Sequence, residues 1–534
     1  MTYKNYIKNV GFASFIMMMS VFASRIIGIF REIAIAGTHG IKADVDAYQI
    51  AFVLPEILNH IVASGFLSIT FIPIFTSYLL SNNKNEGYKI FSIILNSFGS
   101  FLIVCIFISM IFAPLLVKIL APGITDITTF ESAVKMTRII IPAQFFFFYG
   151  GLLMAIQFAH EKFFIPALAP LIYNLSIICG GLFLSPFIGI EGFAWGALFG
   201  AFFGNFLLQY IAAKKLDMKY YPCLVFNHPA LLKYIKLTLP LMFGLTMTFS
   251  VEIIMKFFGS YLDKGSIAAM NYALRIMFIL VGLFGQAIGV ASYPFMAKLA
   301  QNNDLSSLNE LLNTTMKLIF FVIPFSILFI VLRYEIVLML FQRGQFDANA
   351  SFVTAQILPF FMIGAFAFAA QNIVSRGYYA IQNTIFPVVC TSICVVLSLP
   401  IIFLFMQAFK AIGIAAGISI TIFIQCFILF EFWSKKSLNI EKNKVYVFFL
   451  QIILISLLIG VILFATHFGL KNIIDNKSFY GSFVIAFLIT IEFLFVFFLS
   501  GHIFKNKEIQ FLYNNTLKKI LYYGKKNPID SSKN

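Results

Sequence analysis

The sequence predicts an all-α membrane protein that crosses the bilayer many times. Of its 534 residues, 60% are hydrophobic and 11% are charged, and the mean hydropathy is +0.92. A water-soluble domain carries about 25% charged residues, so the composition excludes that class. Long apolar segments, basic loops between them and an internal repeat define the architecture further.

About 20 apolar residues suffice to cross a bilayer as a helix. On this rule the chain contains fourteen predicted spans, numbered here in chain order. They lie near residues 10–34, 45–79, 90–117, 134–158, 163–186, 191–213, 234–258, 266–297, 312–340, 352–381, 386–407, 411–434, 445–466 and 479–503. Several exceed 25 residues, which predicts tilt, helix that protrudes beyond the lipid, or a kink at a proline such as Pro55.

The basic residues predict the topology. With the N-terminus inside, 24 of the 38 Lys and Arg residues fall in cytoplasmic loops and tails, and 11 fall in external loops. An excess of positive charge marks the cytoplasmic side, so both termini are expected there. The net charge of +16 therefore reflects topology rather than a nucleic-acid partner. The first apolar segment runs directly into Arg25 and is followed by further spans, which predicts an uncleaved helix rather than a signal peptide.

An internal repeat predicts two similar lobes. Four residue pairs share an offset of 221 positions: Pro73 and Pro294, Pro166 and Pro387, Gly192 and Gly413, and Gly196 and Gly417. The offset covers six spans, so both halves would have the same orientation in the membrane. We expect an N-lobe at 1–233, a C-lobe at 234–436, two further spans at 437–504 and a cytoplasmic tail at 505–534. In transporters with such repeats, the substrate site lies between the halves near the midplane.

Arginines inside the spans are the main site candidates. Arg25 and Arg31 lie one helical repeat apart near the outer end of the first span, and Arg275 lies in the eighth. A charge at mid-bilayer costs about 2.5–3.5 kcal/mol on insertion scales, which makes such a residue a functional candidate. We expect Arg25 and Arg275 to share a central anion-binding cavity. The alternatives are a snorkelling arginine or a structural ion pair, and Glu32 could neutralise Arg31.

Five further polar or charged residues in the spans are site candidates, and most of them also have a structural interpretation. Asp46 opens the second span, either as a helix N-terminal residue or as a cavity partner of the arginines. Glu252 and Lys256, four positions apart, either pair with each other or form a coupling or gating pair. Arg376 lies at the inner end of the tenth span, where it either marks the cytoplasmic side or acts as a gating residue. Asn174 is an amide in an apolar span and needs a hydrogen-bond partner.

No motif predicts an enzyme or a bound cofactor. The six histidines lack metal-ligand spacing, and neither HExxH nor a GxxxxGK[ST] phosphate loop occurs. The six cysteines predict no disulfide framework. The longest loop has about twenty residues, which argues against a membrane glycosyltransferase or a non-transporting scaffold.

Several short motifs occur in the order typical of one transporter family. They are SRIIGIFRE, DAYQIAFVLPEIL, GFLSITFIPIF, APG at 121–123, NYALRIM, LFQRGQF and SRGYYAIQNTIFPV. Across spans 1 to 12 the chain therefore resembles the MurJ/MviN family, the lipid II flippases of peptidoglycan synthesis, which belong to the MOP superfamily with the MATE exporters. The resemblance implies fourteen helices, two six-helix lobes, a central cationic cavity, and a groove on the last two helices for the polyprenyl tail.

The resemblance also implies site residues, and the chain departs from the family at some of them. The implied cavity residues are Ser24, Arg25, Arg31, Asp46 and Arg275, with Asn174 as a polar contact near them. The family usually has two arginines at the positions of Asn59 and His60, and an acid at the position of Ser64. Asn59 is a further substrate-binding candidate. Leu274 and Met255 also stand where the family has acids. In the family the acid at the position of Met255 is associated with a sodium site, so this departure weighs against a sodium site here.

The function expected on these grounds is that of a lipid II flippase of the bacterial cytoplasmic membrane. It would work as a monomer by alternating access, without a cofactor and with the membrane potential as driving force. Its expected partners are lipid II, membrane lipids, and the machinery of peptidoglycan synthesis and division. The alternatives are an exporter of another polyprenyl-linked glycan or a MATE-like cation-coupled exporter, although a cationic cavity argues against cationic drugs as cargo.

Overall fold

The computed structural model describes residues 3–59, 66–80, 83–246 and 250–503. Within these ranges the regular elements are helices, and no strand occurs. The predicted all-α class is therefore confirmed. The chain divides into two compact units, and each is described by itself.

The first unit comprises Met1–Tyr272, Phe341–Ala350 and Phe403–Ile414. A π-helical segment, Ala201–Leu207, joins the helices Glu191–Gly200 and Leu208–Lys214. The helices are α1 (Tyr3–His39), α2 (Ala43–Ala51), α3 (Val53–Leu58), α4 (Phe66–Leu80), α5 (Lys84–Ile111), α6 (Ala113–Leu120), α7 (Ile127–Ile140), α8 (Ala143–Ala159), α9 (Phe164–Ile188), α10 (Glu191–Gly200), α11 (Leu208–Lys214), α12 (Pro229–Thr246), α13 (Ser250–Gly259) and the first half of α14 (Ser266–Leu280).

The second unit comprises Ala273–Leu340, Ser351–Ile402 and Ala415–Asn534. It begins with the second half of α14 and a π-helical segment, Val281–Gln286. Its other helices are α15 (Ala287–Gln301), α16 (Leu305–Ile319), α17 (Val322–Val331), α18 (Arg333–Phe341), α19 (Ala348–Ala380), α20 (Ile385–Lys436), α21 (Lys442–Lys471) and α22 (Phe479–Ile503). The last residue of α18, the first turn of α19 and the middle of α20 at Phe403–Ile414 belong to the first unit. The division predicted from the repeat, into lobes at 1–233 and 234–436, stays a prediction.

Ten helical segments in the described ranges are long and apolar enough to cross a membrane. The predicted count of fourteen spans stays a prediction. One of the ten, α20, contains Lys410 with the non-helical dihedral angles φ 52° and ψ −129°. This kink separates the predicted spans at 386–407 and 411–434, so α20 consists of two helices joined at Lys410.

The second predicted span is broken as its proline suggests. Helix α2 ends at Ala51 and α3 begins at Val53. The ring of Pro55 clashes with the carbonyl of Ala51, four residues earlier, and its nitrogen carries no hydrogen, which favours a kink or break at this point. Glu56 is the residue that follows the proline.

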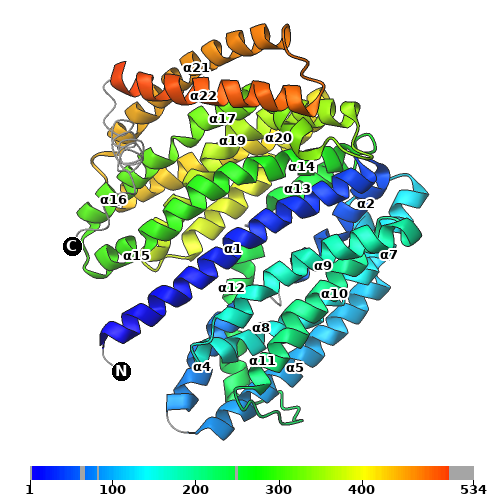
Figure 1. The fold of residues 1–534 in the computed structure, drawn as a ribbon. Helices are drawn as coiled ribbons and strands as arrows, with labels where there is room; N and C mark the ends of the chain where they lie inside the picture. The colour runs from blue at the N-terminus through cyan, green and yellow to red at the C-terminus, as the bar shows by residue number, and fades with distance from the viewer. Residues whose placement is uncertain (1–2, 60–65, 81–82, 247–249, 504–534) are drawn as a thin grey trace, which may run out of the picture. The chain divides into compact units, whose positions relative to one another are not determined.

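Close contact between α9 and α10 depends on four glycines spaced by four residues. A Cβ atom added to Gly196 would lie 2.6 Å from the Ser176 carbonyl oxygen, and one added to Gly192, Gly200 or Gly204 would lie 2.8–3.0 Å from other α9 backbone atoms. Small residues at this spacing let two membrane helices approach until their backbones touch. The two helices run side by side in Figure 1, and α1 packs on the same helix α9.

The residue pairs of the internal repeat take matching local positions. Pro73 and Pro294 each lie inside a helix, α4 and α15 respectively. Pro166 and Pro387 are each the third residue of their helices, α9 and α20. Gly413 packs against the Phe405 backbone on the far side of the Lys410 kink, as Gly192 packs against the end of α9. The repeat seen in the sequence is thus a repeat of local structure.

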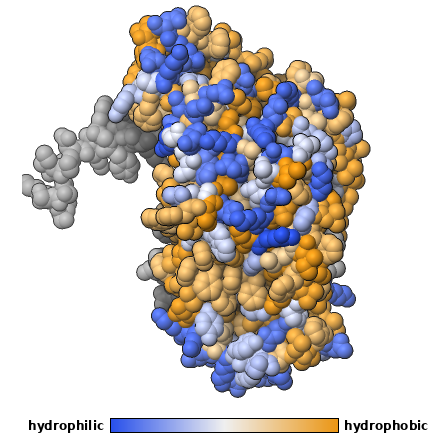
Figure 2. All heavy atoms as spheres, turned by 90° about the vertical axis from the view of Figure 1, so that its right-hand side faces the viewer, coloured by the Kyte–Doolittle hydropathy of each residue, from blue (hydrophilic) through white to orange (hydrophobic). Residues whose placement is uncertain are grey.

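Large apolar side chains cover much of the surface. Phe187 on α9 is 84% exposed and Phe495 on α22 is 68% exposed. In the space-filling view, hydrophobic residues occupy broad areas with hydrophilic residues gathered between them (Figure 2). Exposed apolar surface on this scale is expected for helices whose solvent is lipid.

Candidate functional site

Helix α1 presents its two arginines in different environments. Arg25 and Arg31 are six residues apart, and at 3.6 residues per turn this places them about 120° apart around the helix. The expectation that they lie one helical repeat apart was wrong, because the same face of a helix recurs after seven residues and not after six. Arg31 lies on the side that meets α9, whereas Arg25 is exposed.

Ser24, Arg31 and Asn174 form one hydrogen-bonded group. Arg31 Nη1 donates to Asn174 Oδ1 at 3.1 Å, and Asn174 Nδ2 donates to Ser24 Oγ at 3.2 Å. Ser24 is seven residues before Arg31, so both side chains reach α9 from the same face of α1. Asn174 is 9% exposed and therefore has the partners that a buried amide requires.

Glu32 neutralises Arg31, as its position in the sequence suggested. Arg31 Nη2 donates to Glu32 Oε1 at 2.7 Å, and Asn271 Nδ2 donates to Glu32 Oε2 at 3.2 Å. Glu32 is 3% exposed and Asn271 is fully buried. Sequence reasoning missed Asn271, although this residue opens the motif NYALRIM, and a polar amide in an apolar span is a signal that could have found it. The group joins α1, α9 and α14 and fixes the guanidinium of Arg31.

Arg25 has a different character from Arg31. It is exposed, and the structure shows no hydrogen bond or ion pair between its side chain and any residue in the described ranges. Because Arg31 and Glu32 form a neutral pair, the net positive charge of this part of α1 is that of Arg25. Among the candidates of the first unit, it is therefore the cation available to an anionic ligand.

Asp46 binds the start of another helix. Its Oδ2 accepts a hydrogen bond from the Gly265 backbone N–H at 2.6 Å, and its Oδ1 accepts one from Ala268 at 2.8 Å. Asp46 is 6% exposed, and it is the fourth residue of α2, whose own N-terminal flanking residue is Lys42. A carboxylate at a helix N-terminus is favourable because the first N–H groups have no partner inside the helix. Asp46 thus holds α14 against α2.

Lys256 pairs with a residue that sequence reasoning missed. Its Nζ lies 3.6 Å from Glu56 Oε2, and Lys256 is 1% exposed. Glu252, the partner expected four residues earlier, is half-buried on the same helix, α13. The signal that could have found Glu56 is its place in an apolar segment directly after Pro55, where an acid needs a cation.

Two candidates lie in the second unit. Arg275 is half-buried on α14. Arg376 on α19 lies over the ring of Tyr293 on α15, with its guanidinium carbon 6.0 Å from the ring centre, and a Cβ added to Gly289 would meet its Nε at 2.9 Å. This cation–π contact fixes α19 against α15. That Arg25 and Arg275 share a cavity stays a prediction, as does a gating role for Arg376.

The remaining candidates come from the family resemblance. Asn59 is half-buried at the end of α3. His60 and Ser64 lie outside the described residues. Across the part of the chain that the structure describes, no three His, Cys, Asp or Glu side chains gather as ligands for a metal ion.

Comparison with known proteins identifies the family of this chain. The family described as "Lipid II flippase MurJ" matches residues 35–486, well over half of the chain. The chain belongs to the lipid II flippase MurJ family. A "Probable lipid II flippase MurJ" of Buchnera aphidicola subsp. Baizongia pistaciae is 28% identical over 470 residues, which are 86% of this chain and 90% of that protein. The "Lipid II flippase MurJ" of Thermosipho africanus is 27% identical over 518 residues, 96% and 99% of the two chains.

Solved structures agree with the MurJ assignment. A structure titled "Lipid II flippase MurJ, inward closed conformation" has a TM-score of 0.74 and 26% identity and covers 91% of this chain and 99% of that one. A multidrug resistance MATE family transporter of the MOP superfamily has a TM-score of 0.64 at 13% identity and covers 78% of this chain and 95% of its own. The second likeness shows a shared fold alone. The predicted family is therefore confirmed, and the chain shares its fold with a MATE transporter.

Proposed function

We propose that this protein is a lipid II flippase that moves the undecaprenyl-diphosphate-linked peptidoglycan precursor from the inner to the outer leaflet of the bacterial cytoplasmic membrane. Membership of the MurJ family supports the substrate. The observation that carries the proposal in this chain is Arg25, an exposed guanidinium on an apolar helix next to an arginine that is already neutralised.

The chemistry of the substrate explains why such a group is needed. A diphosphate and a sugar-peptide head cannot enter hydrocarbon alone, because each polar group without a partner costs several kcal/mol. The planar guanidinium of arginine binds phosphate through two parallel hydrogen bonds. Arg25 would bind the diphosphate, and Arg275 is the second cation that we assign to it.

The Arg31 group has a positioning role in this proposal. Asn174 and Glu32 occupy both Nη atoms of Arg31, so its side chain cannot swing toward a ligand without breaking contacts of 3.1 and 2.7 Å. Its Nε is buried and has no hydrogen-bond partner among the described residues. We therefore assign to Arg31 the stiffening of α1 against α9, which holds Arg25 in place.

The membrane potential can supply the energy. With the cytoplasm negative, exporting about two negative charges is downhill by roughly 4–5 kcal/mol per 100 mV. We propose transport by alternating access with this driving force and without a covalent step. Both termini would lie in the cytoplasm, as the distribution of basic residues predicts.

Reconstitution tests the proposal directly. Proteoliposomes with labelled lipid II should show protein-dependent translocation that increases when a potential, negative on the donor side, is imposed. Arg25→Gln should lower the rate at least tenfold and Arg25→Lys by less, because lysine keeps the charge and loses the bidentate geometry. Lys477→Gln, at an exposed loop position, is the matched control and should transport normally.

Two results would contradict the proposal. Arg25→Gln protein that transports lipid II at the normal rate would remove the role of this cation. Translocation of a different polyprenyl-linked glycan, with no activity on lipid II, would move the protein to the alternative exporter function.

A further inference from the structure

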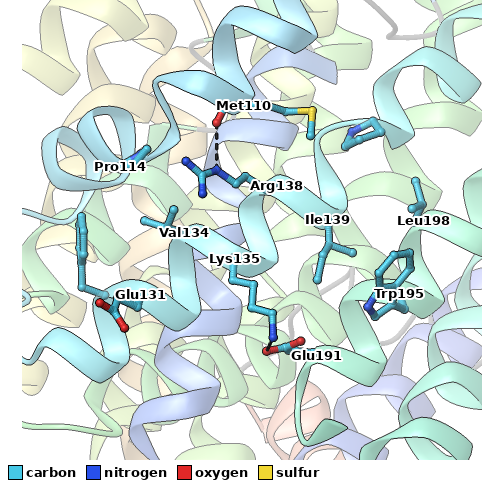
Figure 3. Close-up of a pocket in the computed structure, with 12 residues that line it drawn as sticks. Met110, Pro114, Glu131, Val134, Lys135, Arg138, Ile139, Glu191, Trp195 and Leu198 are labelled. Atoms are coloured by element: carbon cyan, nitrogen blue, oxygen red, sulfur yellow. Dashed lines mark hydrogen bonds and ion pairs between the residues drawn. The ribbon is translucent and has the colours of Figure 1, made fainter.

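A pocket of about 780 Å³ lies in the first unit, apart from the residues discussed so far. Helices α5, α6, α7 and α10 form its walls (Figure 3). Among its lining residues are Met110, Glu131, Lys135, Arg138, Glu191 and Trp195. None of them belongs to the Arg31 group, and nothing in the proposed function depends on them.

The pocket lies where hydrocarbon meets the polar headgroups. Helices α7 and α8 together span 33 residues, or about 50 Å, against a hydrocarbon core of about 30 Å. Residues 139–159 contain no charged side chain, so the apolar part begins directly after Arg138. Trp195, which is 36% exposed, has the amphipathic ring typical of this level.

The surface around the pocket is apolar. Phe107 and Ile111 on α5 are 61% and 68% exposed, and Phe199 on α10 is 44% exposed. These side chains lie within a turn or so, along their own helices, of the pocket residues Met110 and Trp195. A molecule bound in the pocket could therefore keep an apolar tail in the bilayer.

Arg138 is held in place and still has donors to offer. Its Nε donates to the Met110 carbonyl oxygen at 3.0 Å, which directs the guanidinium toward α5 (Figure 3). The structure shows no hydrogen bond from its two Nη atoms to any described residue. An arginine fixed through Nε presents these two nitrogens as a ready phosphate-binding pair.

Glu131 supplies the opposite charge at a second point. It lies seven residues before Arg138 on the same face of α7, about 10 Å away along the axis. It is exposed, and it has no ion pair with a residue in the described ranges. Lys135, between them, is already paired with Glu191 at 2.7 Å. The charges still available are therefore one cation and one carboxylate, seven residues apart on one helix.

We propose that this pocket binds a zwitterionic membrane phospholipid, with the phosphate on Arg138 and the headgroup ammonium on Glu131. The apolar wall formed by Ile139, Pro142 and Leu198 takes the start of an acyl chain. A lipid with a net negative headgroup satisfies Arg138 and leaves Glu131 without a cation. The charge pattern therefore selects phosphatidylethanolamine over phosphatidylglycerol, and on the predicted topology the lipid comes from the outer leaflet.

Lipid retention measures this preference. The full-length protein, reconstituted in nanodiscs with equal phosphatidylethanolamine and phosphatidylglycerol, is extracted in mild detergent, and its bound lipids are counted by native mass spectrometry. We expect the wild-type protein to retain phosphatidylethanolamine at least threefold over phosphatidylglycerol. Arg138→Gln should lose both lipids, and Glu131→Gln should keep phosphate binding while losing the preference.

Control variants make the result decisive. Lys477→Gln and Glu310→Gln, exposed charges of the second unit, should retain lipid as the wild type does. Arg138→Lys keeps the charge and should retain more lipid than Arg138→Gln. If Arg138→Gln fails to fold, the Glu131→Gln result decides by itself. Equal retention of both lipids by the wild type, or unchanged preference in Glu131→Gln, would overturn the proposal.

Discussion

The two arginines of α1 show how environment divides the roles of one residue type. Arg31 is 20% exposed and held by Glu32 and Asn174, whereas Arg25 is exposed and carries the net charge. A buried ion pair contributes little net stability, because desolvation offsets the attraction, but removal of one partner leaves a buried charge. Glu32 therefore contributes to stability, and binding is the role that we propose for Arg25.

Replacement of Glu32 tests this division. Glu32→Gln should lower the free energy of unfolding by about 3 kcal/mol, because it leaves the Arg31 guanidinium buried without a counter-charge. Thermal unfolding in detergent measures the change. Glu441→Gln, which removes an exposed partner of Lys444, should leave the melting temperature nearly unchanged. A normal melting temperature for Glu32→Gln would mean that Arg31 has another adequate partner.

Variants at Asp46 separate a structural role from a substrate role. Asp46→Ala should destabilise the protein by about 1–2 kcal/mol, because the N–H groups of Gly265 and Ala268 lose their acceptor. Asp46→Ser offers an oxygen again and should recover part of the stability. Transport per folded molecule is the second measurement. Restored stability with transport still lost would show that Asp46 also acts on the substrate.

Membrane helices associate through backbone contact rather than through the hydrophobic effect. Lipid is as apolar as the side chains, so membrane helices associate through close packing and hydrogen bonds. The glycine series from Gly192 to Gly204 lets α10 lie directly on α9, and α9 in turn supplies Asn174 to Arg31. Packing of α10 thus helps to position the proposed site.

A pair of glycine variants tests this contact. Gly196→Ala should destabilise the protein by about 1–3 kcal/mol, because its Cβ would lie 2.6 Å from the Ser176 carbonyl oxygen and 2.8 Å from Ile177 Cα. Gly151→Ala on α8 is the control, since its Cβ would meet no atom within 4 Å. Unfolding temperatures of the two purified variants give the comparison. Equal temperatures would show that α9 and α10 can separate at little cost.

At the scale of the whole molecule, the topology remains to be measured. The distribution of basic residues puts the loop before α21 in the cytoplasm and the loop between α21 and α22 outside. Ile440 is 93% exposed and Lys477 is also exposed, so either position accepts a reporter.

Cysteine labelling reports the side of each loop. In a variant whose native cysteines are replaced, Lys477→Cys should react with a membrane-impermeant maleimide in intact cells. Ile440→Cys should react only after the membrane is permeabilised. The reverse pattern would invert the topology and, with it, the direction of transport that we propose.

The sequence by itself determined the fold class, the break before Pro55, the internal repeat and the family. Each depends on information local to a segment: hydropathy over about 20 residues, a proline ring that kinks or breaks a helix, or a motif in fixed order. It also grouped Ser24, Arg31 and Asn174 through the family resemblance, and it identified Glu32 as a neighbour of Arg31.

Only the tertiary structure decided which charged residues find partners far away in the sequence. Asp46 meets Gly265 across 219 positions and Lys256 meets Glu56 across 200, and no period within one helix encodes such contacts. The pocket around Arg138 likewise needs four helices. Periodicity states which side chains share a face, but the packing of helices determines what that face meets.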